Sequence, residues 1–137
     1  MNSRPDWDTY FLSIARVVAS RASCPRASVG AVIVSQDHRI LSTGYNGAPP
    51  NEPHCSDVGC LIVDGHCQRT LHAEVNAIAH AAKVGIALDG AKLYVHMTTK
   101  AGQESKAPEI PCRECTKVMK AANVVMGKAW WVIGPAA

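Results

Sequence analysis

The sequence has few aromatic residues, no long hydrophobic run and little excess of charge of either sign. Aromatic residues make up 5% of the 137 positions, so the core must be built mainly from Ala, Val, Ile and Leu. The longest apolar runs, such as residues 29–34, are far shorter than the roughly 20 residues of a membrane-spanning helix, which excludes such a helix. The formal charge of +3 falls short of the basic surface of a dedicated nucleic-acid-binding protein but suits a small anionic ligand.

The N-terminal segment is polar and lacks the apolar core of a signal peptide, so we predict a cytoplasmic protein. In a reducing cytosol, six cysteines are more often metal ligands or small buried side chains than disulfides. The chain has no internal repeat, low-complexity tract or linker, and its length suits one domain over residues 1–137.

The spacing of apolar residues predicts alternating helices and strands. Helices are expected from a cap at Asp6 or Asp8 to about residue 20, over residues 70–84 with Thr70 as cap and Gly85 as stop, and from Pro111 in a first turn to about residue 122. Strands are expected over residues 29–34, 40–45, 91–97 and 129–133, the first two as an antiparallel hairpin. Residues 46–68 and 98–110 are expected to be loops, the first long enough to be functional. This order predicts an α/β sandwich around one mixed sheet.

Two short motifs stand at the expected starts of helices, His72-Ala73-Glu74 and Pro111-Cys112-Arg113-Glu114-Cys115. One imidazole and two thiolates are good zinc ligands, and three protein ligands leave the fourth tetrahedral position open to water, as in catalytic sites. The N-termini of helices favour thiolate over thiol, which lowers the cost of forming these ligands.

Glu74 follows His72 by two residues, a spacing that places the two side chains on different sides of a helix. We therefore expect Glu74 to carry protons rather than bind metal. Zinc lowers the pKa of bound water from 15.7 toward about 7, and a nearby carboxylate can move the released proton to a ring nitrogen and then to a leaving amine. The pair of motifs is typical of zinc nucleobase deaminases. The alternative is that His72 is a hydrogen-bonded core histidine and that Cys112 and Cys115 are buried apolar groups.

On these residues the sequence resembles the cytidine and deoxycytidylate deaminase superfamily, and more closely its deoxycytidylate (dCMP) deaminase branch. The resemblance runs from the first expected helix to about Ala122. Its strongest stretches are Val29-Gly30-Ala31-Val32-Ile33-Val34, Thr43-Gly44-Tyr45-Asn46-Gly47-Ala48-Pro49, His72-Ala73-Glu74-Val75-Asn76-Ala77-Ile78 and Pro111-Cys112-Arg113-Glu114-Cys115. The element Gly-Tyr-Asn-Gly-x-Pro favours this branch over the free-nucleoside and tRNA-editing branches. The resemblance implies a three-layer α/β/α cytidine-deaminase-like fold with a central mixed β-sheet.

The resemblance also implies roles for individual residues. His72, Cys112 and Cys115 would bind the catalytic Zn²⁺, and Glu74 would be the proton shuttle. Asn46 would hydrogen-bond the sugar or the base edge of the substrate, the alternative being a turn residue before Gly47. Ala73 and Arg113 are further candidates for substrate contacts. Apart from the resemblance, the candidate phosphate contacts are Arg26, Lys83, Lys100, Lys106 and Arg113, the alternative being solvated surface cations. Trp130 and Trp131 are expected in the core or at an interface, the alternative being stacking on a base.

A second group of candidate ligands consists of Cys24, Cys55, Cys60 and Cys67. Some members of the branch carry a second, structural zinc, and Cys24 and Cys55 fall at positions matching its ligands. Cys60 and Cys67 would complete a closed site that stabilises a loop without a core of its own, with His54 or His66 as substitutes. The alternative is a set of free, buried thiols.

The sequence departs from the resemblance in two places. Residues 98–110 form a longer link before the Pro-Cys-x-x-Cys motif than is usual, and this link borders the site. The sequence ends at Ala137, where members commonly continue into a further strand and helix. The first departure leaves the exact substrate open, and the second leaves open the C-terminal side of the pocket and the contacts between subunits.

The sequence therefore predicts a zinc-dependent aminohydrolase that deaminates a free pyrimidine nucleotide, dCMP being converted to dUMP with release of ammonia. The expected partners are a small nucleotide and further copies of the chain, not a membrane or nucleic acid. A deaminase of another nucleoside, nucleotide or base, including adenosine or cytidine in RNA, is the first alternative. A zinc domain without enzymatic activity is the second, and Glu74 argues against it because a structural site needs no carboxylate at an open position.

Overall fold

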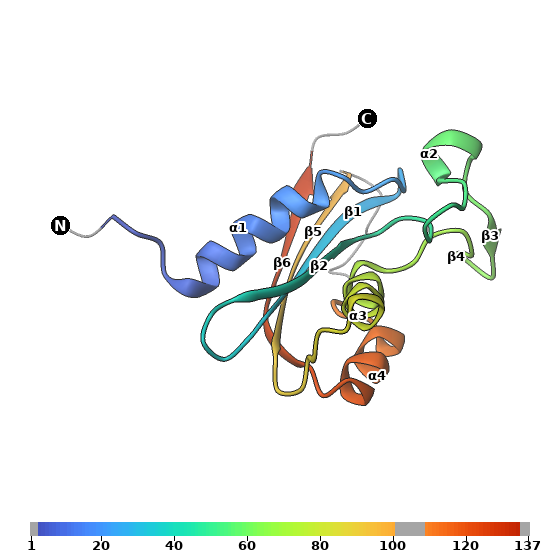
Figure 1. Cartoon of the computed structure of the whole chain (residues 1–137). Coiled ribbons are helices and arrows are strands. Elements are labelled where there is room, and N and C mark those ends of the chain that lie inside the picture. The colour runs from blue at the N-terminus through green and yellow to red at the C-terminus, as the bar shows by residue number, and fades with distance from the viewer. Residues whose placement is uncertain (1–2, 101–108, 135–137) are drawn as a thin grey trace.

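A computed structural model describes residues 3–100 and 109–134, and it contains one four-stranded sheet with helices on both faces (Figure 1). The elements in chain order are α1 (Trp7–Ala19), β1 (Ala27–Val34), β2 (Ile40–Tyr45), α2 (Cys55–Val58), β3 (Ile62–Val63), β4 (His66–Cys67), α3 (Ala73–Val84), β5 (Lys92–Lys100), α4 (Arg113–Ala121) and β6 (Val125–Gly134). The strand order in the sheet is β2-β1-β5-β6. β1 runs antiparallel to β2 and β5, whereas β5 and β6 are parallel, so the sheet is mixed as predicted.

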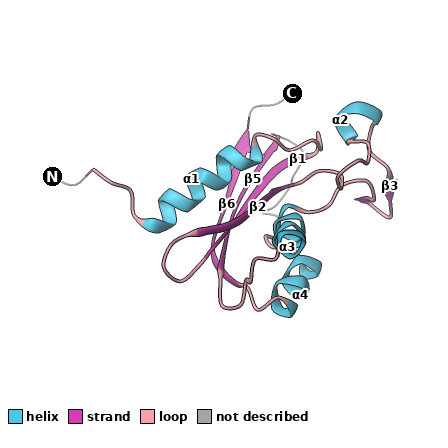
Figure 2. Ribbon diagram, viewed as in Figure 1, coloured by secondary structure: helices cyan, strands magenta, loops and turns pink. Residues whose placement is uncertain are grey.

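The helices cover the sheet in two layers, α1 on one face and α3 with α4 on the other (Figure 2). Alternate residues of β1 point to opposite faces, with Val32 and Val34 packed under α1 and Ala31 and Ile33 packed under α3. Both faces of β1 are therefore buried, which explains the unbroken apolar run of this strand. The predicted three-layer α/β/α fold is confirmed.

None of the helices in the described part of the chain is long and apolar enough to cross a membrane.

Gly44 in β2 allows α3 to lie directly against the sheet. A Cβ atom at this position would stand 2.4 Å from the Ala77 nitrogen and 2.5 Å from the Ala73 oxygen, both in the backbone of α3. Any larger residue would push the helix away, since real Cβ atoms do not approach backbone so closely. The glycine thus fixes the position of the first turns of α3, which carry the predicted catalytic residues.

The helices α3 and α4 both begin later than the sequence predicts. The prediction that Thr70 caps the second of the three predicted helices is wrong, because α3 begins at Ala73 with His72 as its N-cap. The reason is a long-range bridge, in which Gly47 and Leu71 exchange two backbone hydrogen bonds and hold the chain extended at that point. The prediction that Pro111 lies in the first turn of the next helix is also wrong, because α4 begins at Arg113 with an extended Cys112 as its N-cap. Asp6 caps α1 and Gly85 ends α3 as predicted.

The predicted loop 46–68 contains local structure. The short helix α2 and the small hairpin β3–β4 lie in a segment that projects from the sheet beyond α3 (Figure 1). We call residues 48–70 the arm, and the Gly47–Leu71 bridge closes its base. Strands β5 and β6 are also longer than predicted, because they pair along their whole length from Lys92↔Val125 to Lys100↔Gly134. The start of the predicted 98–110 loop therefore belongs to β5, and residues 101–108 lie outside the described residues.

Candidate active site

His72, Cys112 and Cys115 form one compact cluster of possible metal ligands. The Nδ1 atom of His72 lies 3.2 Å from the Sγ atom of Cys115 and 3.4 Å from that of Cys112. All three ligand atoms lie within 4.8 Å of one another. Bond lengths of 2.0–2.1 Å to nitrogen and 2.3 Å to sulfur in a zinc tetrahedron imply a nitrogen–sulfur separation of about 3.6 Å. Both the donor atoms and their spacing therefore fit Zn²⁺.

Two helix N-termini bring these ligands together. His72 is the N-cap of α3, Cys112 is the N-cap of α4, and Cys115 lies in the first turn of α4. The helices α3 and α4 pack against each other on the same face of the sheet. The positive ends of two helix dipoles thus meet at the cluster and favour thiolate ligands.

Cys115 and Glu74 are buried next to the cluster. Burial raises the pKa of the Cys115 thiol, and the neighbouring Glu74 carboxylate adds to the increase. A thiolate at this position therefore needs a cation beside it, which a metal ion would provide. Burial also raises the pKa of Glu74, whose side chain is 4% exposed, whereas its own backbone N–H, His72 and Cys115 oppose that increase. The carboxyl group is thus suited to hold and release a proton.

A cavity of about 490 Å³ opens beside the cluster, a size within the usual range for small-molecule sites. Its lining comes from the ligand helices, from strands β1 and β5, from the end of β2, and from the arm. The lining residues are Cys24, Arg26, Ala27, Val29, Asn46, Gly65, Cys67, Thr70, His72, Ala73, Glu74, Met97, Glu109, Ile110 and Cys112. A ligand in this cavity would therefore contact the metal cluster at one place and the arm at another.

Asn46 lines the cavity, but the structure gives its side-chain amide partners within the protein. The Oδ1 atom accepts a hydrogen bond from the Val29 N–H at 2.8 Å, and the Nδ2 group donates to the Ala27 carbonyl at 2.8 Å. The amide thus continues the β1–β2 ladder beyond the end of β2. One amide hydrogen and one oxygen lone pair are left over, so contact with a substrate stays a prediction.

The other predicted contacts divide between the cavity and the surface. Ala73 is buried and lines the cavity, whereas Arg113 is exposed and is not among the lining residues. Trp131 donates its indole N–H to the Thr99 hydroxyl at 2.9 Å, and Trp130 is 46% exposed on β6. Lys106 lies outside the described residues.

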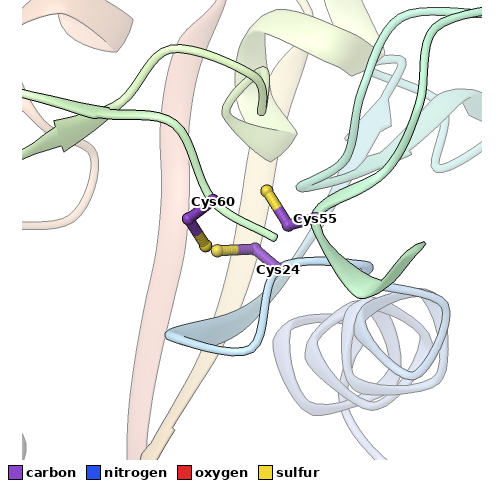
Figure 3. Close-up of side chains that lie close together, drawn as sticks. All are labelled: Cys24, Cys55 and Cys60. Carbon is purple, nitrogen blue, oxygen red and sulfur yellow. The ribbon is translucent and has the colours of Figure 1, made fainter. Parts of the chain in front are cut away.

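The predicted second cluster is also assembled. The Sγ atoms of Cys24, Cys55 and Cys60 lie within 4.8 Å of one another, and Figure 3 shows the Cys24 and Cys60 sulfur atoms directed toward each other beside Cys55. Cys67 is not within that distance of all three, but its Sγ atom lies 3.4 Å from that of Cys55. The three mutually close sulfurs and this contact place the four cysteines in one region at the base of the arm.

The environment of Cys67 favours a thiolate. Although burial opposes it, hydrogen bonds from the backbone N–H groups of Arg69 and Leu61 lower the pKa of the Cys67 thiol to about 6. His54 does not belong to the group of close ligand atoms, and its Nδ1 atom lies 2.6 Å from the Ser23 hydroxyl. The side chain of His66 lies outside the described residues.

Sequence reasoning missed the part that the arm plays in the cavity wall. Gly65, Cys67 and Thr70 line the cavity, and Thr70 also contacts Cys55 with an Oγ1–Sγ distance of 3.1 Å. A signal for this arrangement was present in the sequence. The dipeptide Asp64-Gly65, which stands between Ile62-Val63 and His66-Cys67, is typical of a two-residue hairpin turn.

Comparisons with known proteins agree with this geometry. The family model for the cytidine and deoxycytidylate deaminase zinc-binding region matches residues 5–128. ComE operon protein 2 of Bacillus subtilis (strain 168) is 41% identical over 121 residues, which cover 88% of this chain and 57% of that protein. The deoxycytidylate deaminase of Mycobacterium phage D29 is 36% identical over 133 residues, which cover 89% of this chain and 92% of that protein.

A solved structure supports the same assignment. The crystal structure of dCMP deaminase from the cyanophage S-TIM5 in complex with dCMP and dUMP matches with a TM-score of 0.67 and 26% identity, covering 93% of this chain and 85% of that chain. Since the family model matches most of the sequence and the ligand cluster has the geometry of a zinc site, the chain belongs to the cytidine and deoxycytidylate deaminase family.

Proposed function

We propose that the protein is a zinc-dependent aminohydrolase that converts dCMP and water into dUMP and ammonia. One observation carries this proposal: the buried Glu74 carboxyl group lies beside the His72, Cys112 and Cys115 cluster and faces the same cavity. The choice of dCMP is supported by similarity to proteins named deoxycytidylate deaminase and to a structure that contains dCMP and dUMP.

His72, Cys112 and Cys115 would hold the catalytic Zn²⁺. With three protein ligands and one open position, a bound Zn²⁺ would supply an acidified water molecule. Among the described residues, no fourth His, Cys, Asp or Glu side chain belongs to this cluster, so the donor set is consistent with an open position.

Glu74 would move the protons of the reaction. Its carboxylate accepts a proton from the attacking water and passes it to the N3 atom of the pyrimidine ring, which makes the carbon bearing the amine more electrophilic. A second transfer through the same carboxyl group protonates the amine, which leaves as ammonia while the new carbonyl forms. Burial agrees with this role, because it raises the pKa of Glu74 and so favours the protonated carboxyl group that the amine-protonation step needs.

A panel of substrates tests the proposal. The purified protein is assayed with dCMP, CMP, dCTP, cytidine, deoxycytidine and an RNA oligonucleotide by loss of the cytosine absorbance and by release of ammonia. The expected result is the highest kcat/KM for dCMP. Failure to deaminate any of the nucleotides overturns the proposal, and a clear preference for RNA over free nucleotides would replace it with the polynucleotide alternative.

We also propose that Cys24, Cys55, Cys60 and Cys67 hold a second, structural zinc. The mutual distances of the sulfur atoms and the N–H groups directed at Cys67 support it. Metal analysis of the purified protein should give about two zinc ions per chain, and the Cys60→Ser variant should give about one. A content near one in the unmodified protein overturns this site.

The oligomeric state and the cellular location of the protein are also proposals. We propose a cytoplasmic homo-oligomer, supported by the free cysteines of the described chain and by the exposed Trp130, Val132 and Ile133 on β6. Sedimentation analysis tests the assembly, and a single species at 14.6 kDa would overturn it. Fractionation of cells that produce the protein tests the location.

A further inference from the structure

The second cluster, which consists of Cys24, Cys55, Cys60 and Cys67, reaches the wall of the active-site cavity. Cys24 and Cys67 are both among the residues that line it. Cys55 is buried, with 4% of its surface exposed, whereas the other three are half-buried. A small solute in the cavity can therefore meet sulfur atoms to which the deamination gives no chemical role.

Two sulfurs of this cluster are already in contact. The Sγ atoms of Cys55 and Cys67 lie 3.4 Å apart, and both residues are free thiols. Cys55 is the first residue of α2, and Cys67 ends the small β3–β4 hairpin. A disulfide bond is about 2.0 Å long, so the two sulfurs would have to approach by about 1.4 Å. Because both residues belong to the arm, this shift needs no movement of the central sheet.

Thr70 lies against the same two sulfurs. Its Oγ1 atom is 3.1 Å from the Sγ atom of Cys55 and 3.8 Å from that of Cys67. A hydroxyl group in this place can donate a hydrogen bond to the Cys55 sulfur and stabilise it as a thiolate, the form that attacks another sulfur. Since Thr70 also lines the cavity, a change at the two sulfurs is transmitted directly to the cavity wall.

The two clusters differ in their reactivity toward an oxidant. In the sites proposed above, four thiolates around one Zn²⁺ leave an excess of negative charge, whereas the two thiolates of Cys112 and Cys115 only balance the charge of the ion. Oxidation of cysteine follows thiolate character and access. Cys115 is also buried, with 1% of its surface exposed, while Cys67 is half-buried and faces the cavity. The arm is thus the more oxidisable of the two sites.

We propose that Cys67 and Cys55 form a thiol-oxidation site, at which a hydroperoxide converts the two thiols into a disulfide, displaces the structural zinc and disturbs the cavity wall. This inference rests on the second zinc site proposed above, and it gives that site a regulatory role.

The oxidation takes place in two steps. The Cys67 sulfur attacks one oxygen of the hydroperoxide, the O–O bond breaks, and the other oxygen leaves as an alcohol, or as water when the oxidant is hydrogen peroxide. The Cys55 sulfur then attacks the sulfenic acid on Cys67, the S–S bond forms, and the hydroxyl group leaves as water. The leaving oxygens take their protons from the two thiols or, where zinc has replaced those protons, from solvent. The two sulfurs are oxidised by two electrons in all, and the hydroperoxide is reduced by two.

The test treats the zinc-loaded protein with hydrogen peroxide. We expect a chromophoric chelator to detect about one released zinc ion per chain, free thiols to fall from six to four, and peptide mapping by mass spectrometry to find a disulfide between Cys55 and Cys67. The kcat/KM for dCMP should fall by about 10-fold or more, because a displaced wall misplaces the substrate. A thiol reductant with added Zn²⁺ should reverse all of these changes.

Thr70→Val is a matched variant that keeps every sulfur atom. Its zinc content should not change, but the disulfide should form about 3- to 10-fold more slowly, since the hydrogen bond to the attacking sulfur is lost. Cys67→Ser should form no disulfide at Cys55. A disulfide between Cys112 and Cys115 or between Cys24 and Cys60, or a sulfinic acid at Cys67 without a disulfide, overturns the inference.

The measurements separate this inference from the earlier proposals. Zinc content before oxidation tests the second zinc site by itself, and a chain that holds two zinc ions but forms no disulfide between Cys55 and Cys67 overturns the inference and leaves that site standing. If the protein does not deaminate dCMP but releases zinc as this disulfide forms, the proposed aminohydrolase fails and the inference stands.

Discussion

Two clusters of possible metal ligands lie on either side of one cavity, and they are supported in different ways. His72, Cys112 and Cys115 begin two helices that pack on the central sheet. The second cluster, which consists of Cys24, Cys55, Cys60 and Cys67, joins the segment before β1 to the arm. The arm has almost no core of its own. Four large apolar side chains of the arm are about half exposed, namely Val58, Leu61, Ile62 and Val63. The first cluster is thus positioned by the fold, whereas the second, in the role proposed for it, would stabilise the segment that carries it.

This contrast agrees with the roles proposed for the two sites, chemistry for the first and structure for the second. The catalytic cluster needs only three ligands from the protein, because packing of α3 and α4 holds them, and a fourth position can stay open. A closed set of four ligands is more useful in the arm, where binding energy replaces the missing apolar core. The following predictions test this contrast, beginning with the largest expected effect.

Glu74→Gln should abolish most activity while leaving the fold intact. We expect kcat for dCMP to fall by about 10³-fold or more, because the amide cannot carry the protons. Zinc content should not change, since Glu74 is not among the proposed ligands, and the thermal unfolding temperature should be equal or higher because a buried ionisable group is removed. Kinetics and metal analysis of the same preparation check both statements. Retained turnover would remove Glu74 from the mechanism.

Gly44→Val should lower the unfolding free energy of the core on which the first cluster rests. The new side chain would meet the backbone of α3 at Ala73 and Ala77, and overpacking of this kind costs about 2 kcal/mol or more of unfolding free energy. Urea unfolding measures the loss. Thr43→Val is the control, because Thr43 is the exposed neighbour in the same strand and should change stability by only a few tenths of a kcal/mol. Equal stabilities of the two variants would contradict the close contact between β2 and α3.

Cys55→Ser should damage the arm and spare the core. The change removes a buried ligand of the second cluster, so amide hydrogens of residues 48–70 should exchange faster, by about 10-fold or more, while those of β1 and β5 stay protected. Hydrogen exchange read by mass spectrometry checks this prediction. Equal acceleration in the sheet would mean that the arm is an integral part of the core.

His96 should give the core a small sensitivity to acid. Burial lowers its pKa in the folded state, and the positive charge of Arg16 on α1 adds to this effect. Below the unfolded pKa of about 6.5, the unfolded chain binds a proton that the folded chain resists, so unfolding free energy should fall as pH falls and stay level above that value.

A matched pair of variants isolates this residue. His96→Gln should flatten the pH dependence of stability between about pH 6.5 and 5, and His80→Gln, at an exposed position on α3, should leave it unchanged. Chemical unfolding at a series of pH values gives the slopes. Identical slopes in the unmodified protein and His96→Gln would contradict the prediction.

Local patterns in the sequence were enough to predict the layers and to bring out the catalytic ligands. The apolar run of β1 and the helical spacing of α1 follow from burial alone, and the two short motifs name residues that the structure places together. That these residues bind zinc and that Glu74 carries the proton stay predictions for this chain until they are measured.

What the sequence could not give depends on distant partners. The start of α3 is set by the bridge between Gly47 and Leu71, which are far apart in the chain, whereas the local pattern favours Thr70 as the cap. The lengths of β5 and β6 depend on their mutual pairing. The amide of Asn46 is engaged by Ala27 and Val29, a pairing that no short-range pattern encodes. The hairpin at Asp64 and Gly65 is different, because the signal for its turn is local and present in the sequence.

The bridge between Gly47 and Leu71 has a consequence for protein engineering. The arm leaves and rejoins the rest of the chain at two paired residues, so its two ends lie side by side. We expect that a cassette of different length or sequence that keeps Cys55, Cys60 and Cys67 can be grafted between these two points while the sheet and the helices α3 and α4 keep their connections. Such exchanges offer a route to enzymes that accept altered nucleotides.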